Sequence, residues 1–124
     1  MDFLGSSITR QDVADDEDLF RRVTVSNWII PESDGSTRPS SALYKSTSPD
    51  ISVDIASRTT PQTSIQDALA LACISATEPK KLGYPVVEAP LPDNPAHALI
   101  KGKITRSHAR QLAQKSTWAI PPKR

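Results

Sequence analysis

Hydrophobic and polar residues alternate over residues 51–55 and again over residues 96–100. Successive side chains of a strand point to opposite faces, so a period of two predicts two half-buried strands. In each strand the apolar residues would face the core, and Ser52, Asp54 and His97 would point to the other side. If the two strands are neighbours in a sheet, we expect His97 to lie beside Ser52 or Asp54.

Shorter apolar segments predict the other strands. Residues 71–76 and residues 86–88 each form a compact apolar run, and residues 18–23 suit a short extended or single-turn segment. Trp28 stands beside two isoleucines, a grouping that is typical of a core anchor. The chain therefore predicts about four short strands.

Helix-start signals mark two helices, and a glycine ends a third. Thr60 followed by Pro61 is a typical N-cap with proline in the first helical position, and the apolar spacing extends this helix to about residue 69. A single turn over residues 79–83 ends in glycine. The last helix, residues 105–116, begins at a threonine or serine cap and has one apolar face.

Prolines divide the chain into short elements. There are 11 prolines and four glycines in 124 residues, and proline both fixes φ and removes a backbone donor. Residues 31–49 are predicted to form a long loop, and residues 117–124 to be irregular because they hold two adjacent prolines. The predicted fold class is α+β: a small mixed sheet of about four short strands with two or three short helices.

Charge is distributed unevenly along the chain, although the formal net charge is only +1. Residues 1–20 hold six acids and one base, and residues 101–124 hold seven bases and no acid. We expect residues 1–17 to be a disordered acidic arm, residues 18–118 a single α+β domain and residues 119–124 a basic tail. The basic end suits a nucleic-acid or acidic partner, an intramolecular contact with the acidic arm, or simple solvation.

The composition excludes several classes of protein. A single cysteine, Cys73, rules out an intrachain disulfide and is expected to be a small buried hydrophobe. No apolar stretch is long enough for a membrane span, and the N-terminus lacks the pattern of a signal peptide, so we expect a cytoplasmic protein with no membrane contact. There is no phosphate-binding glycine loop, nucleophile elbow or metal-ligand spacing, so no metal and no cofactor are expected, and catalysis stays undecided.

Three polar clusters remain, at residues 21–22, 38–45 and 94–103. The planar guanidinium group of arginine and the hydroxyl group of serine are suited to binding phosphate or carboxylate groups. The same side chains also suit ion pairs, turn caps and a hydrogen-bonded core histidine. The candidate ligand-binding residues are Arg21, Arg22, Arg38, Ser40, Ser41, Tyr44, Lys45, Ser52, His97 and Lys101.

These clusters carry a resemblance to a known family. The motifs are Leu-x-Arg-Arg at residues 19–22, Arg-Pro-Ser-Ser-x-x-aromatic-Lys at 38–45, an Ile-Ser-Val strand at 51–53 and Asn-Pro-Ala-His-Ala-x-Ile-x-Gly at 94–102. Over about residues 18–118 they resemble a family of small bacterial proteins, most of them uncharacterised, with Tyr44 in place of an expected phenylalanine. The resemblance implies a bacterial, cytoplasmic protein.

A looser similarity is to the small toxin-type ADP-ribosyltransferases. That family uses an arginine or histidine on an early strand, a tyrosine or serine on a middle strand and a late catalytic carboxylate. Residues 20–22 and Tyr44 correspond to the first two features. The late carboxylate has no counterpart, because no acidic residue follows Asp93.

Three functions are therefore expected from the sequence, in this order. The first is an accessory or interaction protein that acts with a larger partner encoded in the same operon. The second is a protein that binds a nucleotide-like or other phosphate-bearing ligand, or an enzyme similar to the ADP-ribosyltransferases. The third is nucleic-acid binding through residues 101–124, where Trp118 is the one aromatic side chain that can stack on a base.

Overall fold

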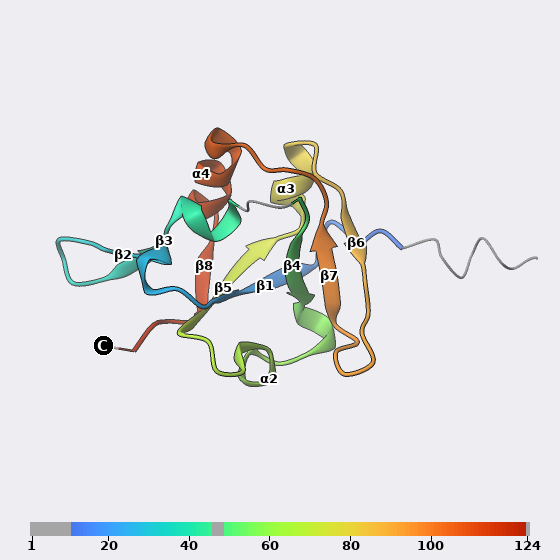
Figure 1. Ribbon diagram of the computed structural model, residues 1–124, viewed down its shortest axis with the longest axis horizontal. Coiled ribbons are helices and arrows are strands. Elements are labelled where there is room, and N and C mark those ends of the chain that lie inside the picture. The colour runs from blue at the N-terminus through green and yellow to red at the C-terminus, as the bar shows by residue number, and fades with distance from the viewer. Residues whose placement is uncertain (1–10, 46–48, 124) are drawn as a thin grey trace, which may run out of the picture.

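A six-stranded sheet forms the body of the protein in the computed structural model, which describes residues 11–45 and 49–123 (Figure 1). The strand order is β6-β7-β4-β1-β5-β8, and each neighbouring pair is antiparallel. A separate two-stranded hairpin pairs β2 with β3. The strands are β1 (Asp18–Val23), β2 (Ile29–Pro31), β3 (Thr37–Pro39), β4 (Ile51–Ile55), β5 (Ala70–Ser75), β6 (Val86–Glu88), β7 (His97–Ile100) and β8 (Thr117–Ile120).

Among the described residues, three short α-helices complete the α+β class expected from the sequence. They are α2 (Pro61–Ile65), α3 (Thr77–Lys81) and α4 (Arg106–Gln114), and the 3₁₀ turns are η1 (Ser26–Trp28), η2 (Ser41–Tyr44) and η3 (Ala56–Arg58). Thr60 and Thr105 cap α2 and α4 as predicted, because each hydroxyl accepts a hydrogen bond from the backbone N–H three residues later. The first helix is shorter than expected: Gln66 has a φ of 52°, which ends α2 well before residue 69.

The sheet has more strands than the four predicted, and it is antiparallel rather than mixed. The expected loop of residues 31–49 contains β3 and the end of β2, and residues 117–124, which were expected to be irregular, contain all of β8. Proline removes a backbone donor, which is tolerated at strand ends and on edge strands. Pro31 and Pro39 stand at hairpin ends, and Pro121 follows the edge strand β8, so these prolines limit the strands without preventing them.

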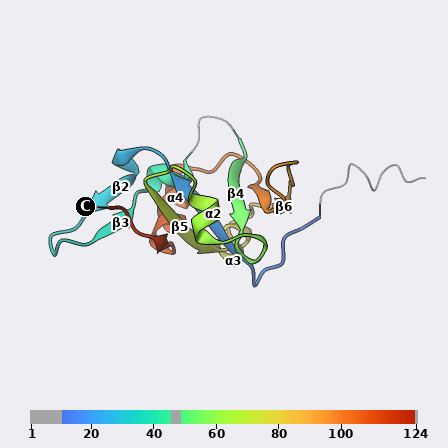
Figure 2. The same cartoon turned by 90° about the horizontal axis from the view of Figure 1, so that it is seen from below.

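The main core lies on one face of the sheet. Ile51, Val53 and Ile55 are buried there, as their alternation predicts. The 3₁₀ turn η2 and helix α4 pack against each other and supply the other wall of this core (Figures 1 and 2). The buried residues of these two elements are Leu43, Tyr44, Ala109, Leu112 and Ala113.

The N-terminal boundary of the domain lies earlier than predicted. Residues 1–10 fall outside the described residues, but residues 11–17 do not form a free arm: residues 11–13 pair with the outer edge of β6, and residues 15–17 bond to residues 75–80. Val13 is only 2% exposed, and its backbone N–H donates to the carbonyl of Val86 at 2.9 Å. Lys80 forms an ion pair with Asp15 at 2.7 Å. The sequence pattern did not predict this contact, because residues 11–17 are mostly acidic and a single buried apolar residue, Val13, anchors them.

Substitution of Val13 tests whether this segment belongs to the folded unit. Val13→Ala should lower the free energy of unfolding by about 1–3 kcal/mol, because it removes buried methyl groups and leaves a cavity. Asp16→Ala is the matched control, since Asp16 lies in the same segment and is exposed. Urea denaturation of both variants measures the effect, and equal stability of Val13→Ala and the unaltered chain would restore the later boundary.

The acidic segment and the basic C-terminal residues lie at opposite edges of the molecule. Residues 11–13 follow β6, whereas β8 and the residues after it form the other edge of the sheet (Figure 1). The described part of the tail therefore does not fold back onto residues 11–17. The domain was expected to end at residue 118, but β8 continues to Ile120.

The sheet divides between β1 and β4. These strands are paired at two positions only, Leu19 with Ile55 and Phe20 with Asp54, whereas β1 and β5 are paired at six. Beyond Phe20 the two strands separate, and the opening between them is visible in Figure 1. We call this opening the fork, lined by Phe20, Arg21, Arg22, Ser52, Val53 and Asp54.

Candidate functional site

Arg21 bridges the fork. Its Nη1 donates to the backbone carbonyl of Ser52 on β4 at 3.1 Å, and its Nε donates to the carbonyl of Leu43 in η2 at 3.1 Å. The guanidinium also lies 5.7 Å from the ring centre of Trp28, at cation–π distance. Arg21 thus holds β4 and η2 in place across the division of the sheet.

The charge of Arg21 is not neutralised by a carboxylate. Burial lowers the pKa of the Arg21 guanidinium, Tyr44 opposes this shift and the nearby Arg22 adds to it. Within residues 11–45 and 49–123, none of the ion pairs involves Arg21. A partly buried cation with only carbonyl and aromatic partners favours the approach of an anion.

Arg22, the next residue of β1, points to the opposite face and joins a buried polar network. Ser64 Oγ donates to Asp54 Oδ2 at 2.6 Å, and Asn94 Nδ2 donates to Asp54 Oδ1 at 2.9 Å. Arg22 Nη1 donates to the Ser64 carbonyl at 3.0 Å and lies 3.8 Å from Asp54 Oδ2. Asp54 is only 4% exposed, so these partners replace the water that its carboxylate loses.

His97 and Ser52 form a hydrogen-bonded pair beside this network. Strands β4 and β7 are neighbours, which fulfils the condition stated from their alternation, and His97 Nε2 lies 3.2 Å from Ser52 Oγ. His97 Nδ1 lies 2.7 Å from the carbonyl oxygen of Ala89. A carbonyl oxygen can only accept, so Nδ1 carries a proton there, and Nε2 forms the contact with the Ser52 hydroxyl. Ser52 is exposed and accessible to a ligand.

The hollow inside the fork is small, with a volume of about 30 Å³. It can take one small polar group, such as a single oxygen of a ligand, and the rest of the ligand would lie outside on the open sheet face. Four of the sequence candidates lie at or beside the fork: Arg21 on the core face of the sheet, and Arg22, Ser52 and His97 on the opposite face. Asp54, Ser64 and Asn94 complete the cluster and were not among the candidates.

The other candidates do not join this site, so the three polar clusters do not form one pocket. Arg38 lies on β3 in the hairpin, at the opposite end of the molecule from β7 (Figure 1). The reason is topological: β3 contacts β8, which is the edge strand on the far side of the sheet from β7. Arg38 therefore does not share a binding site with His97.

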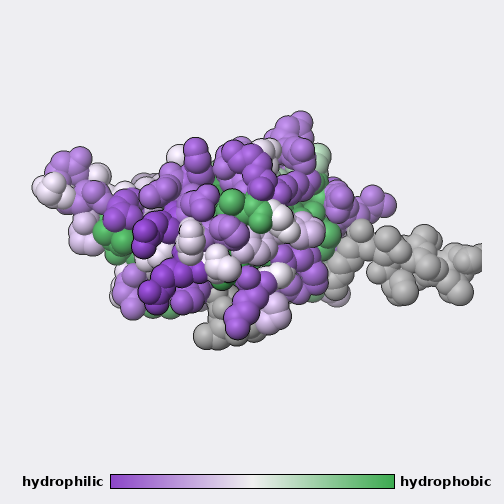
Figure 3. All heavy atoms as spheres, turned by 90° about the horizontal axis from the view of Figure 1, so that it is seen from above, coloured by the Kyte–Doolittle hydropathy of each residue, from purple (hydrophilic) through white to green (hydrophobic). Residues whose placement is uncertain are grey.

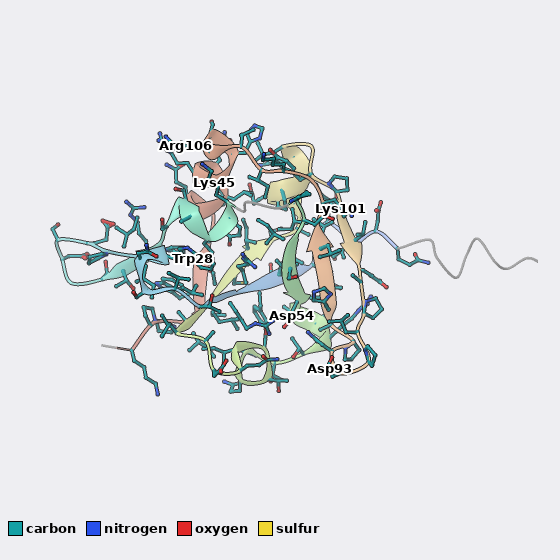
Figure 4. All side chains as sticks on the ribbon, in the orientation of Figure 1. Trp28, Lys45, Asp54, Asp93, Lys101 and Arg106 are labelled. Atoms are coloured by element: carbon teal, nitrogen blue, oxygen red, sulfur yellow. The ribbon has the colours of Figure 1, made fainter. Side chains whose placement is uncertain are left out.

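Structural roles account for several of these candidates. Ser40 caps η2, because its hydroxyl accepts from the Ala42 N–H at 3.1 Å. Tyr44 is fully buried, and Lys101 pairs with Asp50 at 2.7 Å, at the other end of β7 from the position of Asp54 (Figure 4). Lys45 is exposed. Ser41 lies with Arg38 in a separate hollow beside α4.

Other chemistry has less support in the described chain. Over residues 11–45 and 49–123 there is no group of three or more histidine, cysteine, aspartate or glutamate side chains placed to hold a metal ion. Burial raises the pKa of the half-buried Cys73 thiol, which keeps it in its less nucleophilic form. No helix in these residues has the length and apolar character needed to cross a bilayer.

Comparison with protein-family models, with curated proteins and with solved structures gives no match for this chain. The function proposed below is therefore argued from the geometry of the fork.

Proposed function

We propose that this protein binds a small phosphate-bearing ligand of nucleotide type at the fork between β1 and β4. The supporting observation is that Arg21, Ser52 and His97, from three strands, border one opening of the sheet, Arg21 from the core face and the other two side chains from the opposite face. Arg21 supplies a charge without a carboxylate partner, and Ser52 supplies an exposed hydroxyl whose orientation His97 controls. Guanidinium and hydroxyl donors together suit the oxygens of a phosphate group.

The looser similarity to the ADP-ribosyltransferases supports this proposal only in part. An early strand brings the arginines, but Tyr44, which was matched to the second feature, is buried in η2. The middle strand β4, next to β1 at the fork, brings Ser52 instead. The side chain that the late strand β7 brings to the site is His97 rather than a carboxylate. We therefore propose ligand binding as the function and do not extend it to group transfer.

The test titrates the chain with adenosine diphosphate and inorganic pyrophosphate as probes and with adenosine as the uncharged control. Calorimetry and amide NMR shifts measure the binding. Both phosphate probes should bind and perturb β1, β4 and β7, and adenosine should bind more weakly than either. Ser52→Ala and His97→Gln should each weaken binding about tenfold, the effect of losing one hydrogen bond to a charged group.

Ser36→Ala is the matched control for Ser52→Ala. Ser36 is also an exposed serine with a side-chain partner, but it lies in the hairpin turn, where it donates to Asp34. It should leave the affinity for pyrophosphate unchanged. Binding that is unaffected at both Ser52 and His97, or no binding of either phosphate probe at millimolar concentration, would refute the proposal.

Association with a larger protein and binding of nucleic acid stay as separate predictions from the sequence. Neither has a specific observation in the described residues that favours it over the fork.

A further inference from the structure

A second hollow, with a volume of about 490 Å³, lies between the hairpin, η2 and α4. Its polar lining comes from Arg38 and Ser41 on one side and from Arg110, Gln114 and Ser116 on the other. Ile30 and Ala113 add apolar surface. Arg38 and Ser41 are the first and last residues of the Arg-Pro-Ser-Ser motif, to which the fork gives no function.

The walls of this hollow are fixed by the core. Tyr44 at the end of η2 lies 2.5 Å from Ser116 Oγ, which in turn donates to the Leu112 carbonyl at 2.9 Å. A hydroxyl has one proton, so the Tyr44 hydroxyl donates to Ser116. Leu112 is buried in the core and anchors α4 to the sheet. Both walls are therefore held before any ligand arrives, which lowers the entropic cost of binding.

The hollow is positively charged, and no carboxylate lines it. Arg38 uses Nε for its ion pair with Glu32 at 2.5 Å, which leaves both terminal Nη groups for a ligand. Arg110 forms none of the ion pairs found among the described residues. Arg106 lies one turn before Arg110 on the same face of α4.

The shape and the lining favour a small molecule over a nucleic acid. The volume falls in the usual range for small-ligand pockets. Bases of single-stranded nucleic acid need aromatic side chains to stack on, and none lines this hollow. The face that carries α4 is mostly hydrophilic, with small separate hydrophobic areas (Figure 3), so a large apolar partner has little to bind there.

We infer that this hollow is a second binding site, which takes the phosphate group of a small phosphate monoester between Arg38 and Arg110. Ser41 and Gln114 add neutral hydrogen-bond donors to the remaining oxygens. The site is separate from the fork and does not depend on the function proposed there.

The experiment titrates the full-length chain with inorganic phosphate and with ribose 5-phosphate at constant ionic strength, and follows the amide NMR shifts. Shifts should centre on Ser41, Arg110 and Gln114. Arg110→Gln should weaken the binding of ribose 5-phosphate by about tenfold or more, because it removes a charge-assisted bond. Arg110 is exposed, so its substitution should preserve the fold. Arg110→Lys should bind with intermediate affinity, because lysine keeps the positive charge but lacks the planar guanidinium group that can bind two phosphate oxygens at once.

Arg58→Gln is the control, because Arg58 is exposed like Arg110 but lies away from the hollow, where it pairs with Glu88 at 2.6 Å. It should leave the affinity unchanged. Equal weakening by Arg58→Gln would show attraction by general charge and overturn the inference. Amide NMR shifts confined to β1, β4 and β7 and abolished by Ser52→Ala would also overturn the inference, because they would place the phosphate in the fork. A single-stranded oligonucleotide that binds more tightly than ribose 5-phosphate, with shifts along all of α4, would overturn it in favour of nucleic acid.

Discussion

Replacement of Asp54 with alanine should lower the free energy of unfolding by about 3–5 kcal/mol, the usual effect of removing one partner from a buried charged network. Asp54 accepts from Ser64 in α2 and from Asn94 in the segment before β7, and it faces Arg22 on β1. The variant leaves a buried hydroxyl, an amide and a guanidinium without their acceptor. Urea denaturation at neutral pH measures the loss.

The matched control for this variant is Asp34→Ala. Asp34 also accepts a hydrogen bond from a serine hydroxyl, that of Ser36 at 2.6 Å, but it is exposed in the hairpin turn. The unfolding midpoint should therefore change little. The double variant Asp54→Ala with Ser64→Ala should lose much less than the sum of the two single losses, because both act on the same bond. A loss below about 1 kcal/mol for Asp54→Ala would show that the network contributes little.

Local patterns in the sequence predicted much of this fold. Alternation over residues 51–55 and 96–100 identified both strands and put Ser52 and His97 on the same face, because side-chain direction in a strand depends only on the period of two. Thr60 and Thr105 marked the two capped helices for an equally local reason. Half of the site at the fork follows from these two strands alone.

The rest depends on contacts that local patterns do not encode. The buried state of Asp54 arises because α2 and Asn94 cover the face that a half-buried strand would leave in water. The separation of Arg38 from His97 follows from the strand order, which no short-range signal specifies. The sequence could have indicated Arg110 as a candidate, because it is a basic residue on a predicted helix that has no acidic residue. That Arg110 and Arg38 line the same hollow depends on how the β2–β3 hairpin packs beside α4.

Tyr44 gives the second large prediction, at alkaline pH. Burial raises the pKa of the Tyr44 hydroxyl to about 12, while its hydrogen bond with Ser116 and the charge of Arg21 oppose that shift. In the unfolded chain a tyrosine titrates near pH 10. The folded state therefore holds the proton more tightly, which contributes stability below pH 10 that is lost as the pH rises through 12. A difference of about two pKa units corresponds to about 3 kcal/mol.

Tyr44→Phe isolates this contribution. At pH 7 the variant should be about 1 kcal/mol less stable than the unaltered chain, because it loses the bond to Ser116. Between pH 10 and pH 12 the difference should shrink and then reverse, since phenylalanine has no proton to lose. Loss of lysine ion pairs such as Lys80 with Asp15 affects both chains equally and cancels in the comparison.

The measurement is urea denaturation of both chains at intervals from pH 8 to pH 12. Tyr84→Phe serves as the control, because Tyr84 is also a hydrogen-bonded tyrosine, to His108, but it is only half-buried and leaves Tyr44 in place. That variant should lose stability at high pH in parallel with the unaltered chain. If Tyr44→Phe also loses stability at high pH in parallel with the unaltered chain, the ionisation of Tyr44 does not cause that loss. η2 would then stay packed against α4 at high pH, with the wall of the second hollow intact.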